Sequence, residues 1–555
     1  MKQLGPMDSA FINLENSNTP QHIGGIGIYD ISTAPGGFVR FKDVIKNFEQ
    51  RLNKVQIFRT RLVNVPGQID RPYWVEDKNF DVEFHLRHIS LPEPGDWRQL
   101  WIQVARLHSR SLDMSRPLWE AYIIEGLDKI PDVPKGAFAI YTKMHHSLVD
   151  GAGGQAFMTA LHDLVPDPAP EDRAASDALV IDREPTDAEL LVKAMVNRTK
   201  NTYSLTKGIA GRAIDLAKYG ISVVRDEIPS PDMQAPKTRF NNPVGPHRVA
   251  DAAVFDLDDF KALKNAAGVT MNDVALSVVG GALRKYLQHC NELPEESLAA
   301  GIPMNMRTRR AHTDENNQVG SMFTSLHTDV EDPVERLHAV HDSAVDAKAS
   351  NETNPMVDAL KIAGVFSPLV SKTVAGLWAK NQLSRFIPLN ISTVISNVPG
   401  PNFPLYSAGA QMVRYHGLGL LTPGCGVFHL VFSCNGVVTV TVLADRDIIP
   451  DPEFYRQCLV ASFEETEKAL LGKARSKKET TKKAKVKKAA VKKSTAKRAA
   501  VKKSVAKKVA MKKAAAKKIP AKRAAAKTRQ AGVSVKRVAS AKTKKKSRAR
   551  STAAV

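Results

Sequence analysis

The composition of the chain changes abruptly after Gly472, and this change decides how much of the chain can fold. Residues 473–555 hold 33 of the 80 Lys and Arg but only one of the 57 Asp and Glu, Glu479. Basic pairs recur every five residues between 482 and 523, a period that rotates a helix by about 140° and so gathers no apolar stripe. A segment without such a stripe cannot bury enough apolar surface to offset its conformational entropy. The sequence therefore predicts a folded part, residues 1–472, and a disordered basic tail, residues 473–555.

The folded part and the tail carry charges of opposite sign. The formal net charge of the whole chain is +23, and residues 1–472 retain 47 basic against 56 acidic residues. A dense polycation associates with polyanions through counterion release, without reading their sequence. No aromatic residue follows Phe463, so stacking on bases is unavailable to the tail. The expected partner of the tail is nucleic acid, and an anionic lipid surface is the alternative.

The pattern of residues 1–472 predicts α/β layering in two successive domains. Strand-like and helical segments alternate over residues 1–165 and again over 246–472, whereas residues 166–245 are rich in Pro and polar residues and form an expected inter-domain connection, partly helical. Within the second domain we expect a hairpin that turns at Asn435-Gly436 and a last helix that stops at Gly472.

Cysteine usage and the first residues indicate a cytoplasmic protein. The four cysteines form no CxxC pair, so neither a metal site nor a disulfide framework is expected. The first residues, MKQLGPMDSAF, lack the apolar core of a signal peptide. An apolar run between Met356 and Trp378 is compatible with ordinary core, with the wall of a lipid tunnel or with a lipid surface. Peripheral association with the inner membrane or with lipid inclusions therefore stays open.

The segment HHSLVDG, residues 145–151, is the strongest candidate for a chemical role. It follows an apolar strand, and strand ends in α/β layers expose reactive groups to a crevice. A neutral imidazole there can take a proton from a hydroxyl group, with His146 as general base. Asp150 can orient this base or anchor its loop, and Gly151 permits a turn. A His pair at a strand end is also a common arrangement of buried side chains without a catalytic role, and His-His-x-x-x-Asp offers too few ligands for a metal site.

The same segment resembles the HHxxxDG signature of the CoA-dependent acyltransferase superfamily. Within that superfamily, the chain is most similar to bacterial wax ester synthase/diacylglycerol acyltransferases, over nearly all of residues 1–472. The resemblance rests on several short motifs in matching order: the opening at residues 5–24, Pro117-Leu118-Trp119, Asn272-Asp273, IPMNMRT at 302–308 and ISNVPGP at 395–401.

This resemblance implies two chloramphenicol-acetyltransferase-like α/β sandwich domains with an active-site tunnel between them. Acyl-CoA would be a substrate rather than a cofactor, and the acceptor would be a long-chain alcohol or diacylglycerol. His146 would act as the general base and His145 would support its loop. Asp150 would turn away from the base and pair with an arginine, for which Arg59 and Arg307 are both candidates.

Three further positions have a structural and a catalytic interpretation. Asn272 and Asp273 follow Thr270 in a T-x-x-D pattern that is typical of a helix start, and the family motif gives Asn272 a possible direct role. Asn397 precedes Pro399-Gly400 and either donates to the oxyanion of the reaction or holds its own turn. The sequence does not choose between these interpretations.

Two other functions stay open beside the leading one. The chain could be another alcohol or amine acyltransferase of the same superfamily, which a screen of acceptors would separate. It could also be an inactive scaffold whose basic tail binds nucleic acid or an anionic membrane. The intact HHxxxDG segment argues against the scaffold.

Overall fold

A computed structural model of the chain describes residues 1–52, 55–148, 158–168, 183–199, 235–305, 319–353, 367–380 and 391–472. The predicted tail, residues 169–182 and 200–234 of the predicted connection, and Asp150, Gly151 and Arg307 lie outside these residues. Residues 1–473 form one compact unit, so the predicted domain boundaries stay a prediction.

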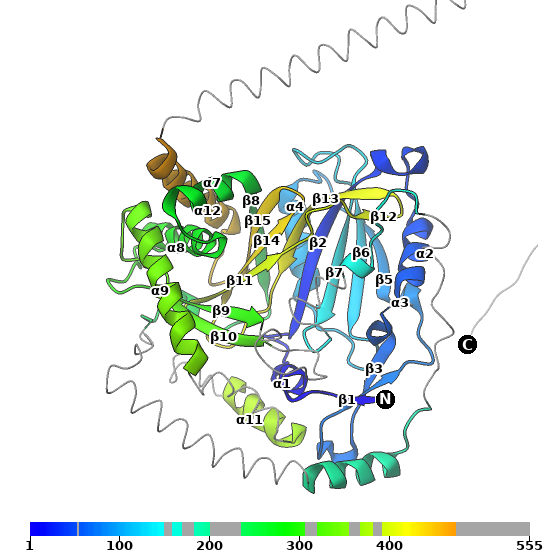
Figure 1. Ribbon diagram of the computed structural model, residues 1–555. Coiled ribbons are helices and arrows are strands. Elements are labelled where there is room, and N and C mark those ends of the chain that lie inside the picture. Colours follow the sequence, from blue (N-terminus) through cyan, green and yellow to red (C-terminus); the bar gives the residue numbers. More distant parts are fainter. Residues whose placement is uncertain are drawn as a thin grey trace, which may run out of the picture. The chain divides into compact units, whose positions relative to one another are not determined.

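The first of two six-stranded sheets has the order β12–β13–β2–β7–β6–β5 (Figure 1). Its strands are β2 His22–Asp30, β5 Leu86–Ser90, β6 Trp119–Glu125, β7 Phe138–His145, β12 Tyr406–Ser407 and β13 Ala410–Leu418. The pair β12–β13 comes from the second half of the sequence, and β13 runs antiparallel to β2. A Cβ atom on Gly25 of β2 would lie 1.9 Å from Oη of Tyr415 in β13. Glycine at this position therefore lets the tyrosine pass over the strand.

The second sheet has the order β10–β9–β11–β14–β15–β8. Its strands are β8 Arg248–Asp256, β9 Ala299–Asn305, β10 Val319–Ser325, β11 Thr393–Pro399, β14 Val427–Cys434 and β15 Val437–Asp445. The predicted hairpin is confirmed, since β14 and β15 are joined at Asn435 and Gly436, whose φ angles of 47° and 84° are those of a tight hairpin turn. A third, small sheet joins β1 Lys2–Gln3, β4 Tyr73–Glu76 and β3 Thr60–Val63.

Helices cover the sheets and fill the space between them. The helices of the first half are α1 Pro6–Leu14, α2 Phe41–Leu52, α3 Val82–His85 and α4 Trp97–His108, with the 3₁₀ turn η3 Gln56–Arg59. Those of the second half are α7 Leu257–Ala267, α8 Met271–His289, α9 Pro333–Thr353, α11 Pro368–Lys380 and α12 Pro452–Leu471. As expected, α12 ends at Gly472 in a positive-φ conformation.

Three large apolar clusters form the core, and two of them contain residues of both six-stranded sheets; one of these two includes α4. In that cluster Leu100 and Val104 of α4 pack with Ile124 of β6 from the first sheet. Ala252 of β8 and Phe428 of β14 contribute to it from the second sheet. Helix α4 therefore lies between apolar faces of both sheets.

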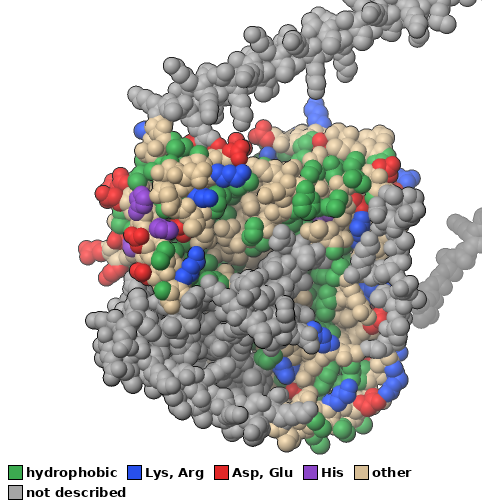
Figure 2. Space-filling model, viewed as in Figure 1, with side chains coloured by type: hydrophobic (Ala, Val, Ile, Leu, Met, Phe, Trp, Pro, Cys, Tyr) green, Lys and Arg blue, Asp and Glu red, His purple; other side chains and the backbone are tan. Residues whose placement is uncertain are grey.

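The described surface carries charges of both signs, and no single helix within it is long and apolar enough to cross a bilayer. One bent pair, α7 with α8, passes that test on length and composition alone. Figure 2 shows acidic side chains gathered at the edge that Figure 1 assigns to α8 and α9. In the second half, Leu369, Val370 and Leu377 of α11 are about half exposed.

Burial holds the pKa of six histidines of the described residues below its ordinary value: His22, His85, His108, His162, His416 and His429. The pKa is about 3 for His108, His416 and His429 and about 4 for His162. Below pH 6.5 the unfolded chain takes up protons that the folded chain does not. Each of these histidines therefore lowers the free energy of unfolding by up to about 1.4 kcal/mol for every unit by which the pH falls.

We therefore expect the melting temperature to fall steeply as the pH is lowered from 7.5 to 5. Asp251 has the opposite effect, because burial raises its pKa to about 6 and the folded chain then binds its proton more readily than the unfolded chain. It is a single group against six histidines. His416→Phe is the matched variant, because among the described residues neither ring nitrogen of His416 has a hydrogen-bond partner and its ring meets two tryptophans edge to face. The variant should show a shallower pH dependence. A melting temperature that does not change over this range would contradict the assignment of neutral buried histidines.

Candidate active site

The two histidines of the HHxxxDG segment lie where β7 ends, as the sequence predicts. His145 is the last residue of β7 and pairs in register with His22 of β2. The His145 N–H donates to the carbonyl of Leu118 at 2.9 Å, and the His146 N–H donates to the carbonyl of Gln21 at 2.9 Å. Residues 146–148 then form a turn closed by the Leu148 N–H on the carbonyl of His145. Main-chain contacts therefore fix the point at which the side chain of His146 leaves the sheet.

The ring of His145 is fully buried, with Nδ1 hydrogen-bonded and Nε2 close to a carboxylate without hydrogen-bond geometry. Its Nδ1 accepts the N–H of Ser147 at 3.1 Å and lies 2.7 Å from the Ser147 Oγ. Its Nε2 lies 2.6 Å from Oε2 of Glu15, the residue that follows α1. Side-chain exposure is zero for His145 and 11% for Glu15. This is the geometry of a supporting side chain rather than of one that meets a substrate.

The ring of His146 is half-buried and stacks on Phe11 of α1. The ring centroids are 4.2 Å apart and the planes differ by 22°. Unlike His145, His146 is partly exposed as a residue, although its Nδ1 is buried; a base that meets a substrate hydroxyl needs such access. Asp150 and Gly151, predicted beside it, lie outside the described residues.

Arg59, one of the two candidate partners of Asp150, ends the turn η3 and already has a carboxylate beside it. Its Nε lies 3.8 Å from Oε1 of the buried Glu76, and its guanidinium lies over the ring of Phe80 at 4.9 Å. The residue before it, Phe58, accepts a hydrogen bond from the indole of Trp119 at 2.8 Å. A pairing of Arg59 or Arg307 with Asp150 stays a prediction.

Asp273 begins α8 in the capping box that its spacing from Thr270 predicts. The Asp273 N–H donates to Oγ1 of Thr270 at 3.3 Å, and the Thr270 N–H donates to Oδ2 of Asp273 at 2.8 Å. The same carboxylate oxygen lies 2.7 Å from Nδ1 of His341 in α9. The structural interpretation of Asp273 is therefore confirmed, while a direct role for Asn272, the second residue of α8, stays a prediction.

The expectation that Asn397 lies in a turn is wrong. Asn397 lies within β11, opposite Val431 of β14, and the strand continues through Pro399. The Gly400 N–H donates to the carbonyl of Ser433 at 2.7 Å, so main-chain pairing holds the segment extended. The alternative that Asn397 holds its own turn is removed, and its role towards an oxyanion stays a prediction.

Comparisons with known proteins identify the family. Residues 4–275 match the wax ester synthase/diacylglycerol acyltransferase catalytic domain, and residues 316–467 match the C-terminal domain of the same family. A Mycobacterium tuberculosis protein classed as a diacylglycerol O-acyltransferase is 32% identical over 469 residues, 84% of this chain and all of that protein. The chain belongs to the wax ester synthase/diacylglycerol acyltransferase family.

Other relatives agree with this assignment. The O-acyltransferase WSD of Acinetobacter baylyi is 30% identical over 81% of this chain and 93% of its own length. The solved wax ester synthase/diacylglycerol acyltransferase of Marinobacter aquaeolei VT8 has a TM-score of 0.58 at 27% identity, over 84% of this chain and 99% of that one. A condensation domain of the calcium-dependent antibiotic synthetase shares the fold at 11% identity, with a TM-score of 0.51.

The chain is therefore an O-acyltransferase of this family, with the two-part α/β fold that the resemblance implied. The expected tunnel stays a prediction. A hollow of about 970 Å³ opens between α8, α9 and α12, but its lining mixes cations and carboxylates and includes none of the predicted site residues. Among the described residues, no group of three or more His, Cys, Asp or Glu could hold a metal ion.

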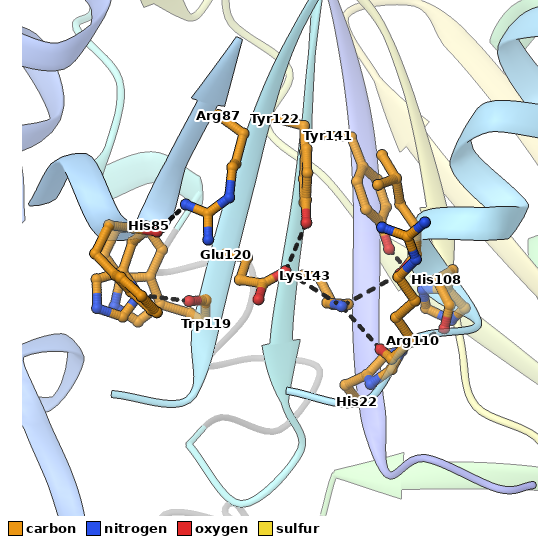
Figure 3. Close-up of polar contacts among 12 residues, drawn as sticks. His22, His85, Arg87, His108, Arg110, Trp119, Glu120, Tyr122, Tyr141 and Lys143 are labelled. Atoms are coloured by element: carbon orange, nitrogen blue, oxygen red, sulfur yellow. Dashed lines mark hydrogen bonds and ion pairs between the residues drawn. The ribbon is translucent and has the colours of Figure 1, made fainter. Parts of the chain in front are cut away.

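A buried lysine behind the histidines ties the acyltransferase site to α4 (Figure 3). Lys143 of β7 is fully buried, and its Nζ donates to the carbonyls of Leu107 at 3.2 Å and Arg110 at 2.9 Å. It lies 3.4 Å from Oε2 of Glu120 in β6. Burial lowers the pKa of Lys143, and Glu120 opposes that shift.

The C-terminal end of α4 is also bound by β2 and by the second half of the chain. The Nε2 of His22 lies 2.7 Å from the carbonyl of His108 (Figure 3). The Nε2 of His108 lies 2.8 Å from the carbonyl of Gly419. The main-chain N–H of Arg248 in β8 donates to Oγ of Ser109 at 3.2 Å. The last turn of α4 is thus a junction between the site strands and the second sheet.

Sequence reasoning missed the residues that surround the two histidines: Phe11, Glu15, Gln21, Glu120 and Lys143. The first three fall in the opening motif, residues 5–24, which marked the segment without assigning roles within it. A lysine within an apolar strand indicates a buried polar or acidic partner for its charge, so the sequence alone could have identified Lys143.

Lys143→Met should lower the free energy of unfolding by about 3–5 kcal/mol, because it leaves two helix-end carbonyls and the Glu120 carboxylate without their cation. Denaturant unfolding measures this change. Lys129→Met is the matched control, since Lys129 pairs with Glu93 on the surface and exposed pairs contribute under about 1 kcal/mol. Equal effects of the two substitutions would contradict the junction described above.

Proposed function

We propose that this acyltransferase moves a long-chain acyl group from acyl-CoA to the hydroxyl of a fatty alcohol or diacylglycerol, forming wax ester or triacylglycerol. The observation that carries the proposed role of His146 is the contrast between the two histidines. His145 is fully buried, with Nδ1 hydrogen-bonded to Ser147 and Nε2 beside Glu15, whereas the half-buried His146 projects from the turn and stacks on Phe11.

In the proposed reaction His146 takes the proton from the acceptor hydroxyl as its oxygen attacks the thioester carbonyl. The new C–O bond gives a tetrahedral oxyanion, towards which Asn397 is the candidate donor. Its collapse breaks the C–S bond, and the CoA thiolate receives the proton from His146. The proton therefore moves from oxygen to sulfur through one imidazole, and no cofactor takes part.

Transfer is proposed to be direct, because the side chains that could form an acyl-enzyme are poorly placed. Burial raises the pKa of Cys425 to about 12 and those of Cys434 and Cys458 to about 11, and it raises the pKa of Cys290 as well. Ser147 contacts His145, which contacts Glu15, in an order that resembles a Ser-His-Glu triad. Ser147 is fully buried, so its hydroxyl is out of reach of a thioester.

His146→Ala should lower kcat by at least about 10² while the protein stays folded, and His145→Ala should retain more activity. The measurement is release of free CoA thiol from a long-chain acyl-CoA in the presence of a fatty alcohol, then of diacylglycerol. An amine acceptor tests the alternative activity within the superfamily. A folded His146→Ala protein that keeps most of its activity would overturn the proposed base.

We also propose that residues 473–555 bind nucleic acid without sequence preference, independently of catalysis. The support is compositional: 33 basic residues against one acidic residue and no aromatic residue. An anionic lipid surface is the alternative partner.

The half-exposed apolar side chains of α11 and the lipid character of the proposed substrates support a cytoplasmic enzyme at the periphery of a membrane or lipid inclusion.

A chain that ends at Gly472 should keep its esterification activity in detergent and lose binding to random-sequence DNA. Binding by the full chain should weaken steeply with salt, because each neutralised phosphate releases condensed counterions. Vesicles with anionic lipid test the alternative partner in the same assay. Loss of catalysis on truncation, or binding of neither polyanion by the full chain at about 50 mM salt, would contradict an independent tail.

A further inference from the structure

Glu15 is a nearly buried carboxylate that faces an imidazole instead of a cation. Its side chain is 11% exposed, and its Oε2 lies 2.6 Å from Nε2 of His145. Within the described part of the chain, no Lys or Arg lies within ion-pair distance of it, and Lys143 acts on it only at longer range. A charge is costly to bury without compensation, so its position calls for a role.

The contacts of His145 fix where its proton lies. A main-chain N–H can only donate, and that of Ser147 points to Nδ1 of His145 at 3.1 Å. Nδ1 therefore carries the lone pair, and the ring proton is on Nε2, which faces Glu15. Oε2 of Glu15 and Nε2 of His145 approach to 2.6 Å without hydrogen-bond geometry, so the carboxylate favours this tautomer and ring orientation by electrostatic attraction to the Nε2–H.

The fixed ring in turn holds the histidine turn, residues 145–148, from which His146 projects. Ser147 is tied back to the His145 ring, and the Leu148 N–H is tied to the His145 carbonyl. The partner of the His146 ring, Phe11, lies one helical turn before Glu15 in the chain. The end of α1 therefore meets both histidines, one through a carboxylate and one through a phenyl ring.

We propose that Glu15 is the positioning residue of the histidine turn and acts on His146 through His145, an inference that rests on the proposed function. Glu15 touches no reacting atom. It holds the neutral Nε2–H form of His145, and this form keeps the turn in the geometry that aims the base. Small displacements of a catalytic group lower kcat strongly, so the effect of Glu15 falls on kcat rather than on substrate binding.

Three substitutions at Glu15 separate the reach of the side chain from its charge. Glu15→Ala removes the carboxylate and should lower kcat about tenfold or more, with KM for acyl-CoA changed by less than about threefold. Glu15→Gln keeps a partially negative oxygen at the same reach and should restore most of kcat. Glu15→Asp keeps the charge but withdraws it by one methylene, so it should be slower than Glu15→Gln. Equal activity of the Ala and Gln variants would overturn the positioning role.

A double-mutant cycle tests whether Glu15 acts through His145. In the His145→Ala background, adding Glu15→Ala should change kcat by less than about twofold, because the partner is already absent. Additive losses would show that Glu15 acts by another route and would overturn the proposal. Melting curves of all four proteins in the cycle show whether a single variant folds poorly, so a loss of folded protein is distinguished from a loss of kcat.

Glu125→Ala is the matched control, because Glu125 lies 3.1 Å from Nε2 of His88 in an exposed pair of the same half. Its kcat should equal that of the parent. If the parent shows no transfer to any acceptor, or His146→Ala stays active, the proposed function fails and the inference fails with it. If those tests succeed and Glu15→Ala keeps full kcat, only the inference fails.

Discussion

The buried ammonium of Lys143 is the interaction on which the geometry of the site depends. It lies on the strand that ends in the two histidines and binds carbonyls at the C-terminal end of α4, where the helix dipole favours a positive charge. The same helix end reaches β8 of the second sheet through Ser109 and the residue that follows β13, Gly419, through His108. One charged side chain therefore couples the position of the histidine strand to the packing of both halves. A hydrophobic residue could fill the volume but could not satisfy the carbonyl oxygens.

Features set by local backbone chemistry were predictable from the sequence. The turn at Asn435-Gly436 requires two positive φ angles, which these residues adopt readily. The start of α8 requires the reciprocal hydrogen bonds that Thr270 and Asp273 provide. The histidine segment was placed at a strand end because an apolar run stops there. In each case the determinants lie within a few residues of the feature.

Features set by contacts between distant segments were not predictable. Pro399-Gly400 favours a turn locally, yet pairing with β14 keeps Asn397 and its neighbours extended. Glu15 and His145 are 130 positions apart, and no local pattern distinguishes Glu15 from the other acids of the first half. The transfer of β12–β13 into the first sheet depends on register with β2, including the fit of Tyr415 over Gly25, which only the assembled sheet reveals.

The pairing of β13 with β2 has a consequence for folding during synthesis, because the two strands are far apart in the sequence. Until residue 418 has left the ribosome, β2 is an edge strand whose main-chain groups lack the partner that β13 provides. At ordinary elongation rates the interval between β7 and β13 lasts on the order of tens of seconds. The unpaired edge of this glycine-rich strand is a template for pairing with other chains. The nascent first half therefore passes through an aggregation-prone stage, during which chaperone binding would protect it.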